Sequence, residues 1–328
     1  MLSRVRLLSQ CLTPPKSISQ RRALWRSTMS ISSTSTSKFT LPGTTPSIPI
    51  THPTCLTQDQ ILNFPAFKTW LATLQHSLSL QTRQSSHPFH SSPYTLRSID
   101  IQSADFFSGG RLGFIKLRAT VTNDQDEHLP GAVFMRGGSV AMLITLSPSD
   151  PDPDSDSHSA GEEYAILTLQ PRIAAGSLNF IEIPAGMLDD SGTFAGAAAM
   201  EIHEETGLEI HSDELLDMTQ LSIQSRGHEQ EQDQASQGTD EVEPHLQKAI
   251  YPSPGGSDEF IPIFLARKSV SRRKIDELKG KLTGLRDHGE KIRLKIVPLN
   301  QVWKAAARDG KTLAALALYQ GLKGEGMI

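Results

Sequence analysis

Residues 182–208 constrain this chain more than any other stretch. A strand-like run at 178–183 leads into them, and they then comprise a Pro-Ala-Gly turn, a short polar loop and an alanine-rich segment. The alanine-rich segment predicts a helix, because it has no proline, follows Thr193 as a candidate N-cap and ends at Gly207 in the C′ position. The stretch therefore reads as a strand, a turn and a capped helix.

Three glutamates share one stripe of this predicted helix. Glu201, Glu204 and Glu205 occupy positions i, i+3 and i+4. A neighbouring apolar stripe would dock the helix on a core and leave the glutamates facing a cavity; it consists of Ala195, Ala198, Ala199 and Ile202. Carboxylates this close repel one another, and a divalent cation relieves the repulsion. Oxygen ligands favour a hard ion, so the stripe predicts Mg²⁺, or Mn²⁺, and an enzyme acting on phosphates. A solvated acidic helix face is the alternative interpretation.

The register of the whole stretch resembles the Nudix box, Gly-x5-Glu-x7-Arg-Glu-U-x-Glu-Glu-x-Gly-U, where U is an aliphatic residue. The matching residues are Gly186, Glu201, Ile202, Glu204, Glu205, Gly207 and Leu208. Two positions depart from the pattern, since Gly192 replaces the first glutamate and Met200 replaces the arginine. In the family that arginine pairs with a box glutamate and orients it, so its loss affects the catalytic rate more than the fold or the metal site.

A second segment indicates which branch of the Nudix family the chain resembles. Residues 251–256 read Tyr-Pro-Ser-Pro-Gly-Gly and resemble the signature downstream of the box in the ADP-ribose and ADP-sugar pyrophosphatase branch. Residues 278–296 look like the plant ADP-sugar diphosphatases of that branch. The resemblance implies an α/β fold, a Nudix α/β/α sandwich with a mixed sheet, preceded by a small β-rich N-terminal domain. Relatives in this branch dimerise through that domain, so a homodimer is expected.

The resemblance also implies a reaction. The metal ligands of the family correspond to Glu201, Glu204, Glu205 and the carbonyl of Ala185. Water attack would split the diphosphate of an ADP-sugar, ADP-ribose or ADP-glucose, into AMP and a sugar phosphate. Glu290 occupies the place of the general base, with His288 as second choice. The alternative function is a catalytically weak or inactive Nudix-like module that binds ADP-ribose or a related nucleotide.

Four further residues are expected to bind the substrate. Arg136 interrupts one predicted strand and Arg172 follows another, and a guanidinium in either place can hold a phosphate oxygen. Gly255 and Gly256 belong to the Pro/Gly signature segment. The structural alternatives are surface salt bridges for the arginines and an ordinary turn for the glycines.

The amino-terminal composition suggests targeting. The first 58 residues contain seven basic residues, many serines and threonines, and no acidic residue. This is typical of a mitochondrial or plastid transit peptide, so residues 1–54 are interpreted as an arm that directs the protein to the mitochondrial matrix. A disordered tail is the alternative, and Met29 offers a second start for a cytoplasmic form. Without those seven of the 32 basic residues, 25 remain against 36 acidic ones, which disfavours nucleic-acid binding.

Several other classes of protein are excluded because the sequence lacks the features that they require. The chain has no 18-residue apolar run, so no membrane span is expected. Cys11 and Cys55 give neither a disulfide framework nor metal-ligand spacing. Gly207 stands where the second histidine of a zinc-protease His-Glu-x-x-His motif must be. No Walker loop or Gly-x-Ser-x-Gly elbow is present.

The periodicity divides the chain after the arm into two domains. Residues 55–130 form the β-rich domain, with a helix at 65–78 and strands at 94–101 and 113–122. Residues 131–328 form the Nudix domain, with buried strands at 132–146, 164–169 and 260–266. Within it an acidic loop spans 147–162, and the Gln/Glu/Ser-rich stretch 222–247 is expected to be a disordered insertion. Helices at 301–308, behind Asn300 as N-cap, and at 312–322 are expected only to pack.

Overall fold

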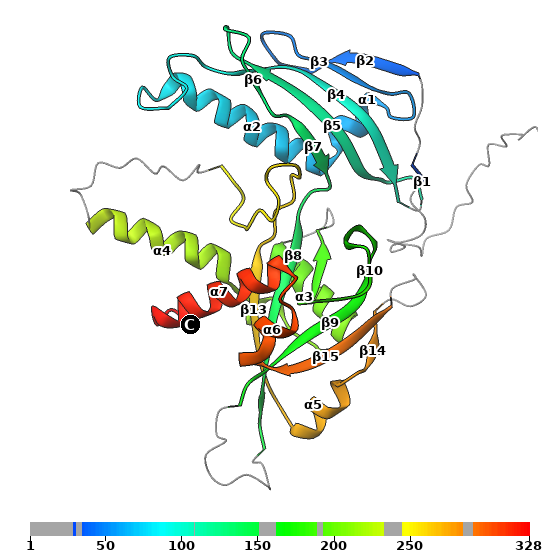
Figure 1. Cartoon of the computed structure of the whole chain (residues 1–328), viewed down its shortest axis with the longest axis vertical. Coiled ribbons are helices and arrows are strands. Elements are labelled where there is room, and N and C mark those ends of the chain that lie inside the picture. Colours follow the sequence, from blue (N-terminus) through cyan, green and yellow to red (C-terminus); the bar gives the residue numbers. More distant parts are fainter. Residues whose placement is uncertain are drawn as a thin grey trace, which may run out of the picture.

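The computed structural model describes residues 29–30, 35–107, 109–150, 162–188, 193–232, 245–284 and 291–328. Figure 1 shows two sheets, each with its own helices, placed one after the other along the long axis of the molecule. No helix in these ranges is both long enough and apolar enough to span a bilayer.

The first sheet comes from the N-terminal part of the chain and has seven strands. They are β1 (Met29–Ser30), β2 (Thr36–Thr40), β3 (Pro49–Pro53), β4 (Thr95–Phe106), β5 (Leu112–Thr122), β6 (His128–Leu129) and β7 (Ala132–Met135). The order is β2-β3-β4-β5-β6, with β1 beside β4 and β7 beside β5. Buried residues alternate with more exposed ones along most of β4 and β5, the pattern of a sheet covered on one face.

Two helices provide that cover. Helix α1 (Gln58–Asn63) begins at a capping box formed by Thr57 and Gln60. It ends at Phe64, whose extended backbone precedes Pro65, because a residue before proline is disfavoured in a helix. Helix α2 (Pro65–Arg83) then starts with that proline at its first position. Both helices pack against the core of the first sheet.

The structure corrects the expected boundaries of the first domain. Strands β2 and β3 lie inside the range 1–54 that the sequence assigns to an arm, and β3 pairs with β4. Ile50 of β3 is fully buried, so this segment belongs to the core. Strand β7 also joins the first sheet, which places the domain boundary a few residues after 130. The short, threonine-rich strands resemble an unstructured tail in composition, which is why the sequence does not reveal them.

The second sheet has eight strands, in the order β12-β13-β8-β9-β15-β14, with β10 on β9 and β11 on β8. They are β8 (Ser139–Pro148), β9 (Tyr164–Arg172), β10 (Ser177–Glu182), β11 (Ala185–Met187), β12 (Leu216–Asp217), β13 (Ile263–Val270), β14 (Leu282–Thr283) and β15 (Ile292–Pro298). The sheet is mixed, because β13 runs parallel to β8 while the other pairs are antiparallel.

Helices cover both faces of this second sheet. They are α3 (Phe194–Thr206), α4 (Met218–Gln232), α5 (Arg272–Leu278), α6 (Val302–Ala305) and α7 (Gly310–Gly324), with 3₁₀ turns η1 (Ile173–Ala175), η2 (Ser212–Glu214) and η4 (Leu299–Gln301). The central strand β8 is buried on both sides: Val140 and Met142 pack in the core with α3 and α5, whereas Ala141 and Leu143 pack with α6 and α7. This is the expected α/β/α sandwich.

Two expected features of the second domain differ from the structure. Residues 222–232 belong to helix α4 and are not a disordered insertion; residues 233–244 lie outside the described residues, as do residues 151–161 of the acidic loop. The helix expected at 301–308 is reduced to η4 and the four-residue α6, so Asn300 is not its N-cap. Helix α7 is longer than expected at both ends and is capped by Asp309, whose side chain accepts from the Thr312 amide.

Candidate active site

Helix α3 presents the acidic residues as its sequence predicts. Thr193 caps the helix, accepting a hydrogen bond of 3.1 Å from the Gly196 amide. Gly207 ends it with a φ of 73°, a left-handed conformation that favours glycine. Ala198 and Ile202 are fully buried against the second sheet, and the adjacent stripe of the helix, three residues further on, directs Glu205 toward β11 and the end of β9.

Glu205 is the most deeply placed carboxylate of the helix. Only 4% of the residue is exposed. Its carboxylate accepts hydrogen bonds from the Ala185 amide (3.2 Å) and, at the longer distance of 3.4 Å, from Nε2 of Gln170. Burial raises the pKa of Glu205 well above its ordinary value, and the charges of Glu201 and Glu182 raise it further. The site therefore concentrates negative charge that these neutral amides do not neutralise.

Glu201 lies directly on the backbone of Gly186. A Cβ atom placed on Gly186 would come within 1.9 Å of the Glu201 carboxyl carbon. The glycine is therefore required for close approach and not for an unusual φ. This contact brings the glycine and the glutamates of the predicted motif together. Glu205 lies against Ala185, and Glu201 lies against the next residue, Gly186.

The third glutamate connects the helix to the next loop. The carbonyl of Glu204 accepts a hydrogen bond of 3.3 Å from the Gly284 amide, just after β14. Residues 285–290 follow, so the expected base Glu290 and its alternative His288 lie outside the described residues. Their assignment stays a prediction, but the loop that carries them starts at the acidic helix.

The residues present are compatible with a divalent cation. No three His, Cys, Asp or Glu side chains in the described ranges are gathered closely enough to hold a metal ion by themselves. Mg²⁺ does not require three, since it commonly uses one or two carboxylates, waters and substrate phosphates. Glu201, Glu205 and the carbonyl of Ala185 would hold it. Burial, and then the charges of Glu201 and Glu182, raise the pKa of Glu205, and a cation bound there would favour the charged carboxylate.

The two expected phosphate-binding arginines are in different places. Nε of Arg172 pairs with Glu182 at 2.5 Å, and the Arg172 charge lowers the pKa of Glu205, so this arginine is in the acidic site. Arg136 pairs with Glu259 at 3.2 Å, at the segment between the two sheets. The structure therefore brings Arg172 to the glutamates of α3 and ties Arg136 to the segment that carries the Pro/Gly signature.

Gly255 and Gly256 also belong to that segment. The amide of Phe134 in β7 donates to the carbonyl of Gly256 at 2.8 Å, which ties the signature to the first sheet. Asp258 accepts from the amides of Arg136 and Gly137, at 2.8 Å and 3.2 Å. Both glycines line a cavity between the two domains and do not contact the acidic helix in the described interactions.

A group of residues that the sequence does not single out completes the site. Glu182, only 2% exposed, pairs with Arg172 and with Nζ of Lys311 at the start of α7. Lys311 also pairs with the N-cap Asp309 at 2.9 Å. Thr312 donates to Asp309 at 2.5 Å and accepts from the Ile183 amide at 3.1 Å. Helix α7 therefore holds the chain immediately before Ala185, which corrects the expectation that it only packs.

Comparison with known proteins identifies the family to which the chain belongs. No family model matches the chain. The chain is 35% identical over 264 residues to Nudix hydrolase 14, chloroplastic, of Arabidopsis thaliana, which covers 80% of this chain and 72% of that protein. A crystal structure of an ADP compounds hydrolase aligns with 71% of this chain and 99% of its own, at 16% identity and a TM-score of 0.40, which is too low to support an argument. On the strength of the curated relative, the chain belongs to the Nudix hydrolases.

Proposed function

We propose that this enzyme hydrolyses the diphosphate bridge of an ADP-sugar, ADP-ribose or ADP-glucose, in the presence of Mg²⁺, with Mn²⁺ as the alternative ion. The observation that carries the proposal is the placement of Glu201 and Glu205 against the backbone of Ala185 and Gly186. A water oxygen attacks one phosphorus, the bridging P–O bond breaks, and the products are AMP and a sugar phosphate. The proton of the water passes to a base, for which Glu290 is the candidate.

The residues of the candidate active site would have distinct roles in this reaction. A bound Mg²⁺ supplies positive charge that neutralises the diphosphate and polarises its P–O bonds. Glu201 and Glu205 would hold that ion in place, and the Ala185 amide orients Glu205 through its hydrogen bond of 3.2 Å. Arg172 is held by Glu182 close enough to Glu205 for its charge to act on that carboxyl, and there it would stabilise the developing negative charge of the diphosphate.

The direct test is release of AMP. The full chain is incubated with ADP-ribose, ADP-glucose, NADH, coenzyme A and a dinucleoside polyphosphate, with and without Mg²⁺. Glu205→Gln should lower the rate roughly 10³-fold, because a ligand of a catalytic metal contributes several kcal/mol to the transition state. Glu209→Gln, on an exposed residue just after the helix, is the matched control and should keep full activity. Equal rates for both variants would contradict the proposal.

A second candidate function follows from Met200. This residue replaces the arginine that the family uses to orient a glutamate, so a module that binds ADP-ribose without cleaving it is the rival. Nucleotide binding without AMP release would favour that rival. Met200→Arg should raise the rate of an enzyme limited by the missing charge, whereas an unchanged rate would show that another contact orients the glutamate.

The proposal includes where the protein acts and in what form. We infer import into the mitochondrial matrix through the basic amino-terminal arm, with a cytoplasmic form starting at Met29, and a homodimer formed through the first domain. The supporting observation for import is the absence of acidic residues before Asp59. Localisation of a fluorescent fusion with and without residues 1–28, and sedimentation of the purified chain, test these two points. Residues 1–28 lie outside the described residues.

A further inference from the structure

Glu182 binds two cationic side chains, one on each oxygen of its carboxylate. Nε of Arg172 donates to Oε1 at 2.5 Å, and Nζ of Lys311 donates to Oε2. Glu182 is buried, so little water competes for either oxygen. Both hydrogen bonds join charged groups, which makes them strong. The two cations therefore divide the carboxylate between them.

This division leaves most of the Arg172 guanidinium unused. A guanidinium has three nitrogens, and among the described interactions only Nε of Arg172 has a protein partner. The side chain of Arg172 is 35% exposed, and its charge lowers the pKa of Glu205. Two terminal nitrogens side by side match two oxygens of one phosphate. Arg172 thus keeps a complete fork available at the acidic site.

A carboxylate with both oxygens free would bind this arginine differently. Guanidinium and carboxylate groups frequently form two parallel hydrogen bonds, one to each oxygen. Without Lys311, Arg172 would turn toward Oε2 as well and direct two of its nitrogens at Glu182. One nitrogen would then remain for a phosphate. The positive charge of Lys311 at Oε2 prevents this, because it repels a second cation.

Helix α7 fixes Lys311 at that oxygen. The N-cap Asp309 accepts from Nζ of Lys311 at 2.9 Å and from the Thr312 amide at 3.2 Å. Lys311 is therefore held between two carboxylates, and its side chain is mostly buried. Its ammonium group is occupied by the protein, whereas the fork of Arg172 is accessible to a ligand.

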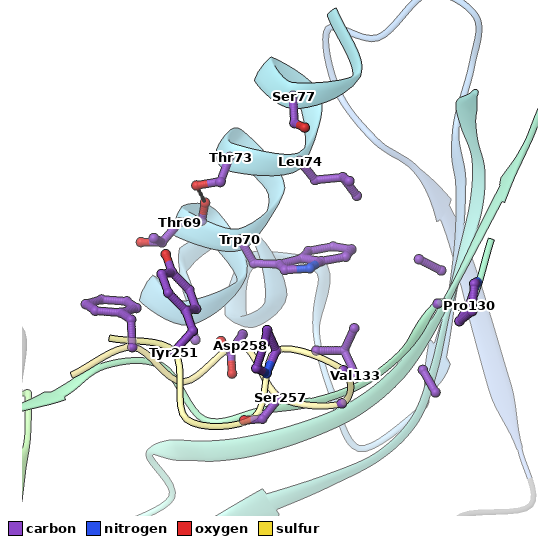
Figure 2. A pocket seen from close by; sticks show the side chains of 18 of the residues that line it. Thr69, Trp70, Thr73, Leu74, Ser77, Pro130, Val133, Tyr251, Ser257 and Asp258 are labelled. Carbon is purple, nitrogen blue, oxygen red and sulfur yellow. Dashed lines mark hydrogen bonds between the residues drawn. The ribbon is translucent and has the colours of Figure 1, made fainter. Parts of the chain in front are cut away.

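This network is separate from the cavity between the two domains. Figure 2 shows that cavity, which is lined by Trp70 of α2 and by Tyr251 of the signature segment. Its described lining includes none of Arg172, Glu182 and Lys311. A substitution of Lys311 therefore acts at the acidic site and leaves the cavity walls as they are.

We propose that Lys311 is a positioning residue for the hydrolysis. By occupying Oε2 of Glu182, it restricts Arg172 to a single contact and keeps both terminal nitrogens of the guanidinium for one phosphate of the substrate. The inference deepens the proposed function and relies on it for the identity of that substrate. It gives the last helix control over how the diphosphate is bound.

Steady-state release of AMP from ADP-ribose with Mg²⁺ tests this role in the full chain, at a temperature at which circular dichroism shows each variant to be folded. Lys311→Met should lower kcat/KM roughly 10- to 100-fold, the effect of losing one charged hydrogen bond to the substrate. Lys311→Arg keeps a cation at Oε2 and should recover most of the rate. Lys323→Met is the matched control, because Lys323 is the other lysine of α7 and is exposed. Equal rates for Lys311→Met and Lys323→Met would overturn the inference.

A double-variant cycle separates positioning from a structural role. Arg172→Lys keeps a cation beside Glu182 but removes the fork. Lys311→Met should therefore lower kcat/KM less than about threefold when Arg172→Lys is already present, because no fork remains to be misdirected. A structural role of Lys311 would cost the same in both chains. A loss as large as that in the unmodified chain would contradict the proposed positioning.

A second background keeps the test decisive even where Lys311→Met alone does not fold. Glu182→Gln removes the buried charge and offers one acceptor oxygen in place of two, so it cannot pair with the fork of Arg172 through both oxygens. Adding Lys311→Met to Glu182→Gln should change kcat/KM less than about threefold. A further loss of tenfold or more would mean that Lys311 acts by another route, and the inference would fail.

The orientation of Arg172 can also be measured without hydrolysis. A crystal structure of Lys311→Met should show two nitrogens of Arg172 roughly 2.7–2.9 Å from the two oxygens of Glu182, where the unmodified chain has one contact. Contact with Oε1 alone would overturn the inference while leaving the hydrolase intact. If the unmodified chain releases no AMP, the proposed function fails, whereas two contacts in this structure would still support the control of Arg172 by Lys311.

Discussion

Glu182 and Glu205 are two carboxylates buried to nearly the same depth within one site, with exposed fractions of 2% and 4%. Glu182 has two cationic partners supplied by the chain, Arg172 and Lys311. Glu205 has two neutral amide donors and lies close enough to two other carboxylates for their charges to raise its pKa. The fold neutralises the first carboxylate with two paired cations, while burial and neighbouring carboxylates disfavour the charged form of the second, which Arg172 offsets only in part. We infer that Glu182 is a structural acid and that Glu205 is the acid available to a metal ion.

The largest effect is expected when one cationic partner of Glu182 is removed, because this tests whether the fold neutralises Glu182. Lys311→Met leaves a buried carboxylate with Arg172 as its remaining cation and should lower the free energy of unfolding by about 3 kcal/mol. Lys311→Arg keeps the positive charge, so its free energy of unfolding should be close to that of the unmodified chain. Urea denaturation checks both variants. If Lys311→Met is as stable as the unmodified chain, Glu182 does not depend on its cations.

The next prediction sharpens the role of the glycine under Glu201. Gly186→Ala places a methyl group where the Glu201 carboxyl lies, and this flexible side chain must move away. We expect kcat to fall roughly 10- to 100-fold, as for a displaced metal ligand, with little loss of stability. Gly321→Ala on α7 is the control, because nothing lies within 4 Å of the added Cβ, and it should gain about 0.4–1 kcal/mol. AMP release and thermal melting distinguish these outcomes.

The pH dependence of stability tests the charge of Glu205. Because its folded-state pKa is raised above 4.5, the native protein binds more protons than the unfolded chain between 4.5 and the raised pKa. Stability should therefore fall as pH rises through this window, by at most about 1.4 kcal/mol per pH unit. Melting of metal-free protein from pH 4.5 upward should show this fall, and Glu205→Gln should abolish it. Mg²⁺ should raise the melting temperature of the unmodified chain and not of the variant.

The smallest effect is expected for Gln170. Its bond to Glu205 is 3.4 Å long, near the limit for a hydrogen bond. Gln170→Met should lower activity less than about tenfold, because the Ala185 amide still orients Glu205. Kinetics at saturating Mg²⁺ measure the change. A loss as large as that of Glu205→Gln would mean that Gln170 contributes more than this contact.

The surroundings of Glu205 could be predicted from the sequence in part, whereas those of Glu182 could not. Local chemistry specifies the acidic helix: Thr193, Gly207 and the glutamate spacing lie within 15 residues, and the structure confirms their helix and its caps. The partner of Glu182 on α7, Lys311, is 129 residues away along the chain. No periodicity links residues so far apart, so the N-cap Asp309 could predict a helix start but not its position beside the site.

Two segments that the sequence predicts to be disordered are ordered in the structure, and each has a physical cause. Helix α4 extends into a stretch with few apolar residues, because glutamine and glutamate are good helix formers even without a buried face. Strands β2 and β3 contain few apolar residues, yet β3 pairs with β4 and buries Ile50, and β2 pairs with β3, so both strands are ordered. In each case tertiary contacts or intrinsic propensity overrode a compositional signal of disorder.

The hydrogen bond from Ile183 to Thr312 has a consequence for biosynthesis. Because the Ile183 amide immediately before the turn donates to Thr312 on α7, the backbone beside the acidic helix is fixed only after a segment 129 residues later in the sequence has been made and has docked. We therefore expect this turn to be ordered late during synthesis of the chain, after helix α3 has already formed.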